Sequence, residues 1–385
     1  MDIVKLKDLT VDGKGTYGVA APAVEYQENL PTYLRITDIL DDGTLNLSEL
    51  KSVKVPDSER YMLRPNDVVF ARTGGSTGRN YFYDGTDGAF VYAGFLIKFS
   101  LDPKKVNPKF IKYFCQSEQY KQWVRSFNTG STRGNINAQT FGNMEIALPG
   151  RKQQDHLVSI LESIDKKIKL NKKINDNLAV LLQTVYQERF GDVDKAVEQG
   201  VLSDICSYSK DRVAVSELDV STYFSTENML PRKAGSTEAT SLPTTPQTTA
   251  CHKGDTLISN IRPYFKKIVY CEDECGCSTD VLCFMPNQPQ YSAYLFSTLY
   301  ADKFFAFMVA GAKGTKMPRG DKQRIMTYPI VLPSEVALAE FNIIALPLIK
   351  QIYSNRAENK RLSLLRDTLL PKLMSGELDV SDIDL

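Results

Sequence analysis

Two glycine-rich loops in the first half of the chain combine arginine and asparagine with glycine, serine and threonine. The first follows Arg72 and spans 73–78, and the second spans 129–137. In the major groove a guanidinium can donate two hydrogen bonds to guanine and an amide can make two with adenine, each pair giving about 1–3 kcal/mol of discrimination. Hydroxyl groups beside them suit phosphate oxygens. The candidate DNA-contacting residues of this half are Arg72, Ser76, Thr77, Arg79, Asn80, Ser131, Thr132, Arg133, Asn135 and Asn137.

The second half carries a comparable but less regular set. The segment after Asp255 runs TLISNIR without the Thr-Gly-Gly of the first half, so the residues of the first loop do not transfer one by one. For both halves the alternative is that the glycines only form hairpin turns and the polar side chains are solvated. The candidates of the second half are Asn260, Arg262, Lys266, Lys313, Lys316 and Arg319.

The sequence lacks the motifs of several catalytic sites. Neither loop has the Gly-Lys-Ser/Thr ending of a P-loop or the three-glycine spacing of a dinucleotide fold. Asp57 and Glu59 lack the following lysine of a nuclease motif, and no Asn/Asp-Pro-Pro-Tyr/Phe run of an adenine methyltransferase is present. We therefore expect a chain that binds DNA without cutting or modifying it, and not an enzyme.

The sequence has seven cysteines and two histidines, and these numbers limit the disulfide, metal and imidazole chemistry that it can carry. An odd number of cysteines without an export signal favours reduced thiols. A soluble, cytoplasmic protein without membrane contact is expected, because no apolar run approaches about 20 residues. His156 is expected to be a solvated residue in the first turn of a helix. No metal site is expected, because two CxxC pairs are missing from the cluster, so its thiols should pack in or near strands: Cys271, Cys275, Cys277 and Cys283.

The net charge of +1 conceals an uneven distribution along the chain. Residues 1–59 carry 6 basic against 11 acidic side chains, whereas residues 60–136 carry 12 against 5. The later stretch 251–324 has 10 against 7. Local positive charge beside Asn, Ser, Thr and Tyr is typical of a surface that meets phosphate, although a solvated charged face gives the same pattern.

The elements that should position these loops occur twice. At an offset of 184 positions Gly130 matches Gly314 and Pro149 matches Pro333, which indicates an internal duplication. Each copy has short β-branched runs and one aromatic helix, at 107–125 and at 291–309, so both copies should mix α and β. The sequence therefore predicts an α+β protein with globular domains at 1–150 and 201–333, long helices at 151–190 and 334–375, a linker at 191–200 and a poorly ordered acidic tail at 376–385.

Each long helix carries a narrow apolar seam at steps of three and four, which is typical of a coiled coil rather than of a helix lying on a globule. Asparagines occupy the middle of both seams, and a seam amide selects the register in which another amide faces it. Antiparallel pairing would bring Asn171 and Asn175 near Asn359 and Asn355. A surface helix with tolerated polar residues is the alternative. The predicted pairing residues are Ile164, Ile168, Asn171, Asn175, Leu178, Leu348, Ile352, Asn355, Asn359 and Leu362, in seams that also include Ile344 and Leu365.

In this order the segments resemble the specificity subunit of type I restriction–modification systems over the whole chain. The residues that carry the resemblance are Leu148-Pro149 leading into 164–178, the second copy at 332–373, and the segment 67–74. The resemblance implies two target-recognition domains separated by two antiparallel helices, each domain recognising one half of a split DNA sequence. It also implies double-stranded DNA, modification (methyltransferase) subunits and a restriction subunit as partners. S-adenosylmethionine, ATP and Mg2+ are expected on those partner subunits, and none of these cofactors in this chain.

Two other interpretations belong to different functional classes. A structural coiled-coil scaffold with protein-binding globular ends would lack the steep salt dependence of DNA binding. A stand-alone nuclease or methyltransferase would show activity of the isolated chain with a divalent metal or a methyl donor.

Overall fold

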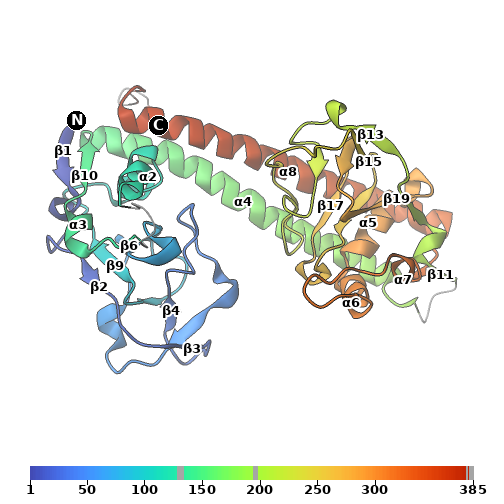
Figure 1. The fold of residues 1–385 in the computed structure, drawn as a ribbon, viewed down its shortest axis with the longest axis horizontal. Coiled ribbons are helices and arrows are strands. Elements are labelled where there is room, and N and C mark those ends of the chain that lie inside the picture. The colour runs from blue at the N-terminus through green and yellow to red at the C-terminus, as the bar shows by residue number, and fades with distance from the viewer. Residues whose placement is uncertain (128–133, 194–197, 379, 381–385) are drawn as a thin grey trace. The chain divides into compact units, whose positions relative to one another are not determined.

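The computed structural model describes residues 1–127, 134–193, 198–378 and 380, which fall into two compact units. Unit 1 consists of Met1–Ile168 together with Arg361–Leu385, and unit 2 consists of Lys169–Lys360. Two long helices, α4 (Arg151–Phe190) and α8 (Glu335–Ser375), contribute residues to both units (Figure 1). Each unit has its own sheets and its own hydrophobic core.

Unit 1 is built around two four-stranded sheets, ordered β2-β9-β6-β7 and β3-β5-β4-β8, and a two-stranded sheet of β1 with β10. Its strands are β1 (Asp2–Lys5), β2 (Thr16–Tyr17), β3 (Ala23–Glu25), β4 (Thr32–Leu34), β5 (Lys51–Val53), β6 (Asp67–Ala71), β7 (Asn80–Tyr83), β8 (Phe90–Tyr92), β9 (Leu96–Ser100) and β10 (Glu145–Leu148). Its short helices are α1 (Pro108–Phe114), α2 (Glu118–Arg125) and α3 (Ala138–Gly142).

Strand β6 lies at the centre of unit 1. It pairs antiparallel with both β7 and β9, and all five of its residues are buried. Burial on both faces explains why its last four residues, 68–71, are a continuous apolar run rather than an alternating one. Phe70 stacks on Phe141 of α3 with ring centroids 4.7 Å apart, which anchors α3 to the sheet. The loop that follows β6 is thereby attached to a rigid strand.

Unit 2 has sheets ordered β12-β19-β16-β17 and β13-β15-β18-β14, and a two-stranded sheet of β11 with β20. Its strands are β11 (Gln199–Val201), β12 (Cys206–Tyr208), β13 (Arg212–Ala214), β14 (Tyr223–Phe224), β15 (Gln247–Cys251), β16 (Thr256–Ser259), β17 (Ile268–Tyr270), β18 (Cys275–Cys277), β19 (Val281–Pro286) and β20 (Pro329–Val331). Its short helices are α5 (Ser292–Tyr300), α6 (Asp302–Ala310) and α7 (Lys322–Ile325).

The two units share a scaffold. The central strand of the first sheet, β6 or β16, pairs antiparallel with a hairpin partner and with a later strand in each case. The second sheets each contain one parallel pair, β4 with β8 and β14 with β18. The predicted α+β class, with two mixed domains and two long antiparallel helices, is confirmed.

The predicted aromatic helices are each interrupted, so both predictions of a single helix are wrong. In unit 1 the Ser117 hydroxyl caps a new helix by accepting from the N–H of Tyr120, which separates α1 from α2. In unit 2 the backbone of Ala301 is extended, with ψ 142°, between α5 and α6. Aromatic spacing alone could not locate these breaks, because the buried face continues across them.

Within unit 2 the two long helices pair through buried amides. Asn171 donates to Asn359 Oδ1 at 2.9 Å and to Glu358 Oε2 at 2.7 Å. Asn355 donates to Asn175 Oδ1 at 2.8 Å, and Asn175 donates to a main-chain carbonyl of α8 at 3.2 Å. Partner numbers fall along α8 as they rise along α4, so the helices run antiparallel in this unit. These are the two amide pairs that antiparallel pairing predicts.

The apolar part of the seam is less regular than predicted. Ile352 is buried and Leu178, Leu348 and Leu362 are half-buried, but Ile344 is 37% exposed. Its place is taken by three residues of α8 that lie in the core of unit 2: Phe341, Ala345 and Ile349. The prediction of Ile344 as a seam residue is wrong, because here the helix lies on a globular core and the core decides which face is buried.

Within unit 1 the same two helices make different contacts. Ile164 and Ile168 are nearly buried, and Arg366 of α8 pairs with Asp165 of α4 at 3.2 Å. Asp165 also accepts a hydrogen bond from the Tyr113 hydroxyl at 2.9 Å. Leu365 is 47% exposed, which corrects its prediction as a seam residue.

The last described residues of the chain take part in unit 1. Val380 is 1% exposed in the core, and its carbonyl lies 2.7 Å from His156 Nδ1. His156 is therefore half-buried and hydrogen-bonded, so its prediction as a solvated residue is wrong. The predicted acidic tail falls partly outside the described residues.

In the part of the chain that the structure describes, one helix is long and apolar enough to cross a membrane by length and composition alone. That helix is α8, with an 18-residue window of mean hydropathy 1.4. Of this window 28% is buried: Phe341 and Ile349 pack in the core of unit 2, whereas Ile343 is exposed.

Candidate nucleic-acid interface

In unit 1 the two predicted loops lie against each other. The N–H of Ile136 donates to the carbonyl of Arg72 at 2.9 Å, and the Thr77 hydroxyl donates to the carbonyl of Gly134 at 3.0 Å. The loop after β6 and the loop before α3 therefore form one surface, called here the unit 1 loop surface (residues 72–79 with 134–137). Segments about 60 positions apart in the chain present their side chains together.

Several predicted contact residues of this surface are already engaged inside unit 1. Arg79 forms an ion pair with Asp41 at 2.7 Å and donates to the carbonyl of Ile39 at 3.1 Å. Asn80 is 7% exposed and donates to the carbonyl of Cys115 at 3.2 Å. These two side chains connect β7 to neighbouring segments, so in this conformation they are structural rather than available to a base edge.

The polar residues of the loops divide in the same way. Asn137 caps α3 by accepting from the N–H of Thr140 at 2.8 Å, and the Thr77 hydroxyl also donates to the carbonyl of Gly74. Ser76 is buried, whereas Asn135 is exposed. Three further candidates, Ser131, Thr132 and Arg133, lie outside the described residues.

Arg72 occupies the centre of the unit 1 loop surface. Its guanidinium lies over the ring of Tyr17, 5.2 Å from the centroid. Its Nε is buried and has no hydrogen-bond partner among the described residues. A buried donor without a hydrogen-bond partner lowers the stability of the fold. Hydrogen bonding therefore does not account for the position of the Arg72 side chain.

Unit 2 repeats this arrangement with different residues. The N–H of Arg262 donates to the carbonyl of Pro318 at 2.8 Å, and the N–H of Gly320 donates to the carbonyl of Asn260 at 3.3 Å. The loop after β16 and the loop before α7 form the unit 2 loop surface (residues 260–267 with 313–320). The central strand of each unit thus ends in a loop that bonds to the loop preceding a short helix.

Unpartnered polar atoms also recur in unit 2. Among the described residues, Asn260 Oδ1 and Arg262 Nε are buried without a hydrogen-bond partner. A Cβ at Gly320 would come within 2.9 Å of that Asn260 oxygen, so the two segments approach closely. Arg262 has a left-handed backbone, with φ 50°, which for a non-glycine residue costs about 1–2 kcal/mol.

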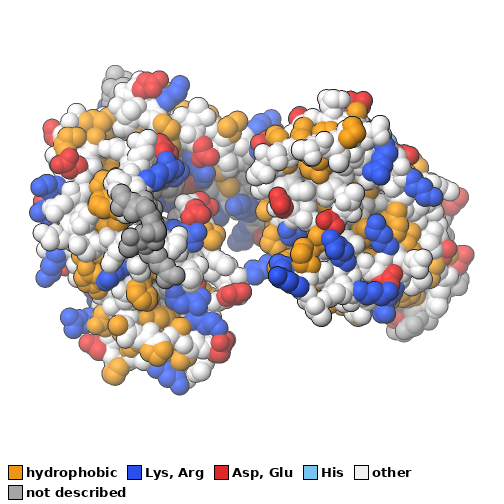
Figure 2. Space-filling view, in the orientation of Figure 1, with side chains coloured by type: hydrophobic (Ala, Val, Ile, Leu, Met, Phe, Trp, Pro, Cys, Tyr) orange, Lys and Arg blue, Asp and Glu red, His pale blue; other side chains and the backbone are white. Residues whose placement is uncertain are grey.

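The basic residues of the unit 2 loop surface pair mostly with local acids. Lys313 pairs with Asp321 at 2.6 Å, and Arg319 pairs with Asp280 at 3.1 Å. Lys316 is exposed at the end of its loop. Basic and acidic side chains alternate over the visible face of each unit (Figure 2). On this face, therefore, carboxylates interrupt the positive charge.

The predicted contact residue Lys266 shares a carboxylate with Lys233, which was not predicted from the sequence. Lys233 and Lys266 both place their ammonium groups 2.8 Å from Asp302 Oδ1. Hydrogen bonds from Lys233 and then Lys266 lower the pKa of the Asp302 carboxyl to about 2. Lys233 lies in 231–250, a segment rich in Thr, Pro and Ser, and its basic character beside Arg232 is the only sequence signal.

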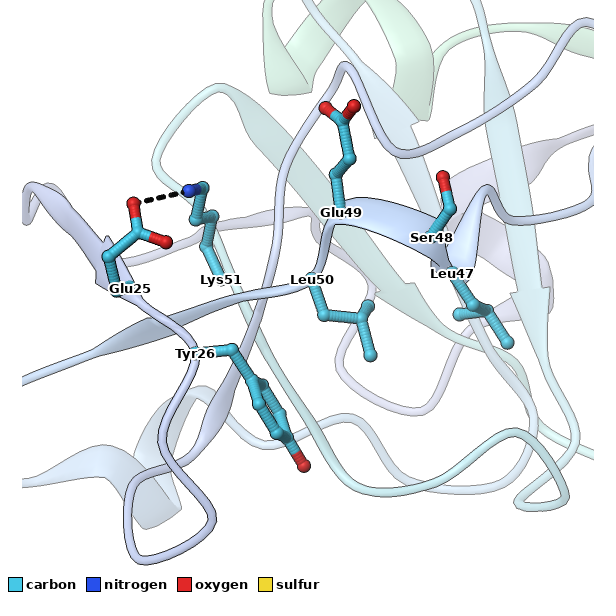
Figure 3. A pocket seen from close by; sticks show the side chains of 7 residues that line it. All are labelled: Glu25, Tyr26, Leu47, Ser48, Glu49, Leu50 and Lys51. Atoms are coloured by element: carbon cyan, nitrogen blue, oxygen red, sulfur yellow. Dashed lines mark hydrogen bonds and ion pairs between the residues drawn. The ribbon is translucent and has the colours of Figure 1, made fainter. Parts of the chain in front are cut away.

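The cavity of unit 1 in Figure 3 does not suit a phosphate. It has a volume of about 430 Å³, and its lysine is already neutralised, because Lys51 pairs with Glu25 at 2.6 Å. Glu49 adds a second carboxylate to its wall. The cavity is therefore no part of the loop surface.

The four clustered cysteines of unit 2 share one hydrophobic core cluster, with Cys275 and Cys277 in β18 of the second sheet and Cys283 in β19 of the first. Cys271 and Cys275 have sulfurs 3.4 Å apart, and Cys283 donates to Asp255 at 3.2 Å. Cys277 is fully buried beside them. Within the described ranges no group of three or more His, Cys, Asp or Glu side chains has an arrangement that could hold a metal ion.

Comparison with known proteins gives a consistent result. Residues 3–179 match the family described as Type I restriction modification DNA specificity domain. The HindI specificity subunit of a type I restriction enzyme from Haemophilus influenzae is 21% identical over 189 residues. The MjaIX specificity subunit from Methanocaldococcus jannaschii is 34% identical over 76 residues. These matches cover 48% and 20% of this chain, and 41% and 18% of the relatives, so less than half of either relative is matched.

A solved structure extends the likeness in fold to nearly the whole chain. The type I restriction–modification S subunit from M. genitalium superposes with a TM-score of 0.57 at 16% identity, over 97% of this chain and 95% of that one. The resemblance to type I specificity subunits that the sequence predicts is therefore confirmed.

Proposed function

We propose that the chain recognises a bipartite DNA sequence. The proposal starts from the match of residues 3–179 to the DNA specificity domain family of type I restriction–modification systems. Unit 1 would recognise one half of the target and unit 2 the other. One observation supports this division most directly: the central strand of each unit ends in a loop surface built in the same way, with a buried arginine nitrogen left unpartnered in each.

The chemistry of the loop surfaces suits a DNA duplex. Arg72 and Arg262 carry guanidinium groups, which bind guanine edges, and the exposed Asn135 carries an amide, which binds adenine edges. The exposed Lys316 suits a phosphate and would fix the register of the protein on DNA. Engaged residues such as Arg79 would support the loops from behind.

Selection from random duplex DNA tests the proposal. The purified full chain should enrich two short blocks of specified bases separated by an unspecified gap. Binding to an enriched duplex should weaken steeply with salt, because phosphate contacts release counterions. A chain that enriches no sequence, or whose binding ignores salt, would instead support the scaffold with protein-binding ends.

A matched pair of variants tests the division between units. Arg262→Ala should relax base preference within one block only and leave the other block unchanged, with a loss of about 1–3 kcal/mol at the affected position. Lys51→Ala serves as the control, because Lys51 is paired with Glu25 away from the loop surfaces. Equal loss at both blocks would contradict independent recognition by the two units.

The proposed function also includes the partner subunits and the reactions that they catalyse. We infer that the chain carries no catalytic step and positions modification subunits for adenine methylation and a restriction subunit for cleavage. S-adenosylmethionine, ATP and Mg2+ would bind to those subunits. Mapping methylated adenines in a host that expresses the chain with modification subunits should return the selected target, and activity of the isolated chain would overturn this assignment.

The long helices would set the unspecified gap. Adding seven residues to α4 after Leu178, and seven at the facing point of α8, keeps a heptad seam in phase and lengthens each helix by about 10 Å. The gap should then grow by about three base pairs while both blocks stay the same. A folded variant with an unchanged gap would show that the helices pair but do not set the distance between the two recognised blocks.

A further inference from the structure

Two aromatic rings lie at the tip of the unit 2 loop surface. Tyr264 is 50% exposed and Phe265 is 38% exposed, while Pro263 beside them is buried. The two ring centroids are 4.7 Å apart, with an angle of 55° between the planes. Exposed aromatic groups gain by leaving water, so a pair of them at a loop tip indicates a surface that packs against another molecule.

The backbone beneath the rings is fixed from outside the loop. The N–H groups of Arg232 and Lys233 donate to the carbonyls of Phe265 and Lys266 at 2.7 and 2.8 Å. Four basic residues here have left-handed φ values between 50° and 62°: Arg232, Lys233, Arg262 and Lys266. Four non-glycine residues in this conformation keep the tip in one shape, and such strain clusters where function requires it.

Positive charge surrounds the rings. Arg262 and Lys266 flank them in sequence, and the ammonium group of Lys267 lies 6.0 Å from the Phe265 ring centroid. Lys233 and Lys266 share the carboxylate of Asp302, and the ammonium group of Lys267 donates to the carbonyl of Thr226. The tip therefore combines an apolar end with cations on its flanks, which fits a polyanion that has an apolar interior.

Unit 1 has no such feature at the equivalent loop. Its turn consists of Gly74, Gly75 and Ser76, and a Cβ at either glycine would meet nothing within 4 Å. There is space for a side chain and none is present. The turn after β6 therefore carries no ring, whereas the turn after β16 carries two.

We propose that Tyr264 and Phe265 form an aromatic wedge that inserts against a base step of duplex DNA beside the half-site of unit 2. The wedge partly unstacks that step, and the flanking cations contact the phosphates on either side. Unit 2 then selects a deformable step by its shape, whereas unit 1 leaves its half-site stacked. The inference rests on the proposed DNA-binding function.

A scan with 2-aminopurine tests the wedge. The analogue is placed at each position of the selected duplex in turn, and its fluorescence, which rises on unstacking, is measured with the full chain bound. One position beside one block should brighten. The variant Tyr264→Ala with Phe265→Ala should abolish the signal and weaken binding by about ten-fold or more. Tyr264→Phe should retain both, because the ring remains.

The control is a tyrosine of nearly equal exposure in unit 1. Tyr26 is 49% exposed, and Tyr26→Ala should change neither fluorescence nor affinity. The melting temperature should be the same for all variants, since the rings are exposed. If the double variant melts lower, the single Tyr264→Ala variant replaces it.

The outcomes separate the wedge from the proposed function. Absence of salt-dependent, sequence-selective binding by the unmodified chain would overturn both. Selective binding with no brightened position, and wild-type affinity in the double variant, would overturn the wedge alone. Intact DNA binding combined with loss of modification-subunit binding would show that the rings contact protein instead.

Discussion

The loop after β6 and the loop after β16 start from the same place in equivalent sheets and reach different shapes. Unit 1 turns with glycine, at φ +77° for Gly74 and +85° for Gly78. Unit 2 turns with Arg262 and Lys266 at φ 50° and 52°. Glycine adopts such angles without cost, whereas other residues lose about 1–2 kcal/mol each. One scaffold therefore carries either a bare turn or a strained turn that displays large side chains.

The difference shows what each loop needs from its surroundings. The strained turn of unit 2 is held by main-chain bonds from Arg232 and Lys233 and by the carboxylate of Asp302. The glycine turn of unit 1 needs no such support and instead packs against α2, where Gly78 faces Val124. The predictions below alter one side of this comparison at a time.

The largest effect is expected at Gly78. A Cβ there would lie 2.3 Å from Val124 Cγ1 at a left-handed φ, so Gly78→Ala should lower the free energy of unfolding of unit 1 by about 2–4 kcal/mol. Thermal unfolding followed by calorimetry measures this loss. Gly75→Ala is the matched control, because its Cβ meets nothing, and it should be nearly neutral. Equal destabilisation by both would show that the close contact does not govern the turn.

The amide seam of unit 2 gives the next effect. Asn171→Leu alone should destabilise by about 1–2 kcal/mol, because the hydrogen bonds that Asn171 donates to Asn359 Oδ1 and Glu358 Oε2 are lost. Adding Asn359→Leu should raise the melting temperature above that of the single variant and permit other helix registers. Crosslinking of cysteines placed along both helices reports register. A double variant less stable than the single one would contradict the role of these amides as seam residues.

Relieving strain in the unit 2 turn should have a smaller effect of opposite sign. Arg262→Gly should raise the free energy of unfolding by about 1 kcal/mol while weakening DNA binding, because the turn relaxes and the guanidinium is lost. Chemical denaturation and duplex titration measure the two quantities. Arg262→Ala, which keeps the strain, should weaken binding without stabilising. Stabilisation by both variants would show that the arginine, not its φ, is unfavourable.

The smallest effect is the pH dependence of a half-buried histidine in unit 2. Hydrogen bonds to Glu274 and then Asp211, at 2.5 and 3.1 Å, raise the pKa of His252 above its usual 6.5. The stabilisation of the folded state by the charged histidine is therefore complete below the usual pKa, and it is lost as the pH rises through the raised pKa. The melting temperature of the wild type should exceed that of His252→Gln at pH 5.5 and converge with it near pH 8.5. A constant difference would contradict the ionic origin.

The sequence predicted what periodicity and duplication specify. The long helices and the facing of Asn171 with Asn359 follow from a seam repeated at a fixed offset. The pairing of each β-hairpin loop with a distant loop was not predictable, because it depends on how β6 and α3 pack. For the same reason Asn80 appeared to be a free amide although it is buried against Cys115. Side chains on loops have no period, so sequence alone does not separate available residues from engaged ones.

Residues missed in unit 2 illustrate the same limit. Lys233 is about 30 positions from the turn that it supports, and it is 69 positions from Asp302, with which it pairs. Tyr264 and Phe265 were visible in the sequence, but an aromatic pair between basic residues is equally compatible with a strand. Only their exposure and the left-handed φ values around them distinguish a displayed tip from a buried one.

The composition of unit 1 from two separate stretches has a consequence for biosynthesis. Its core includes Leu370, Leu373 and Met374, which are made after every residue of unit 2. Unit 2 is continuous, from Lys169 to Lys360, so its whole core is synthesised before the second stretch of unit 1. The unit that emerges first is thus finished last, and until then the apolar face of α4 around Leu157 and Leu161 lacks its covering helix. A chaperone that acts on nascent chains would meet this protein there.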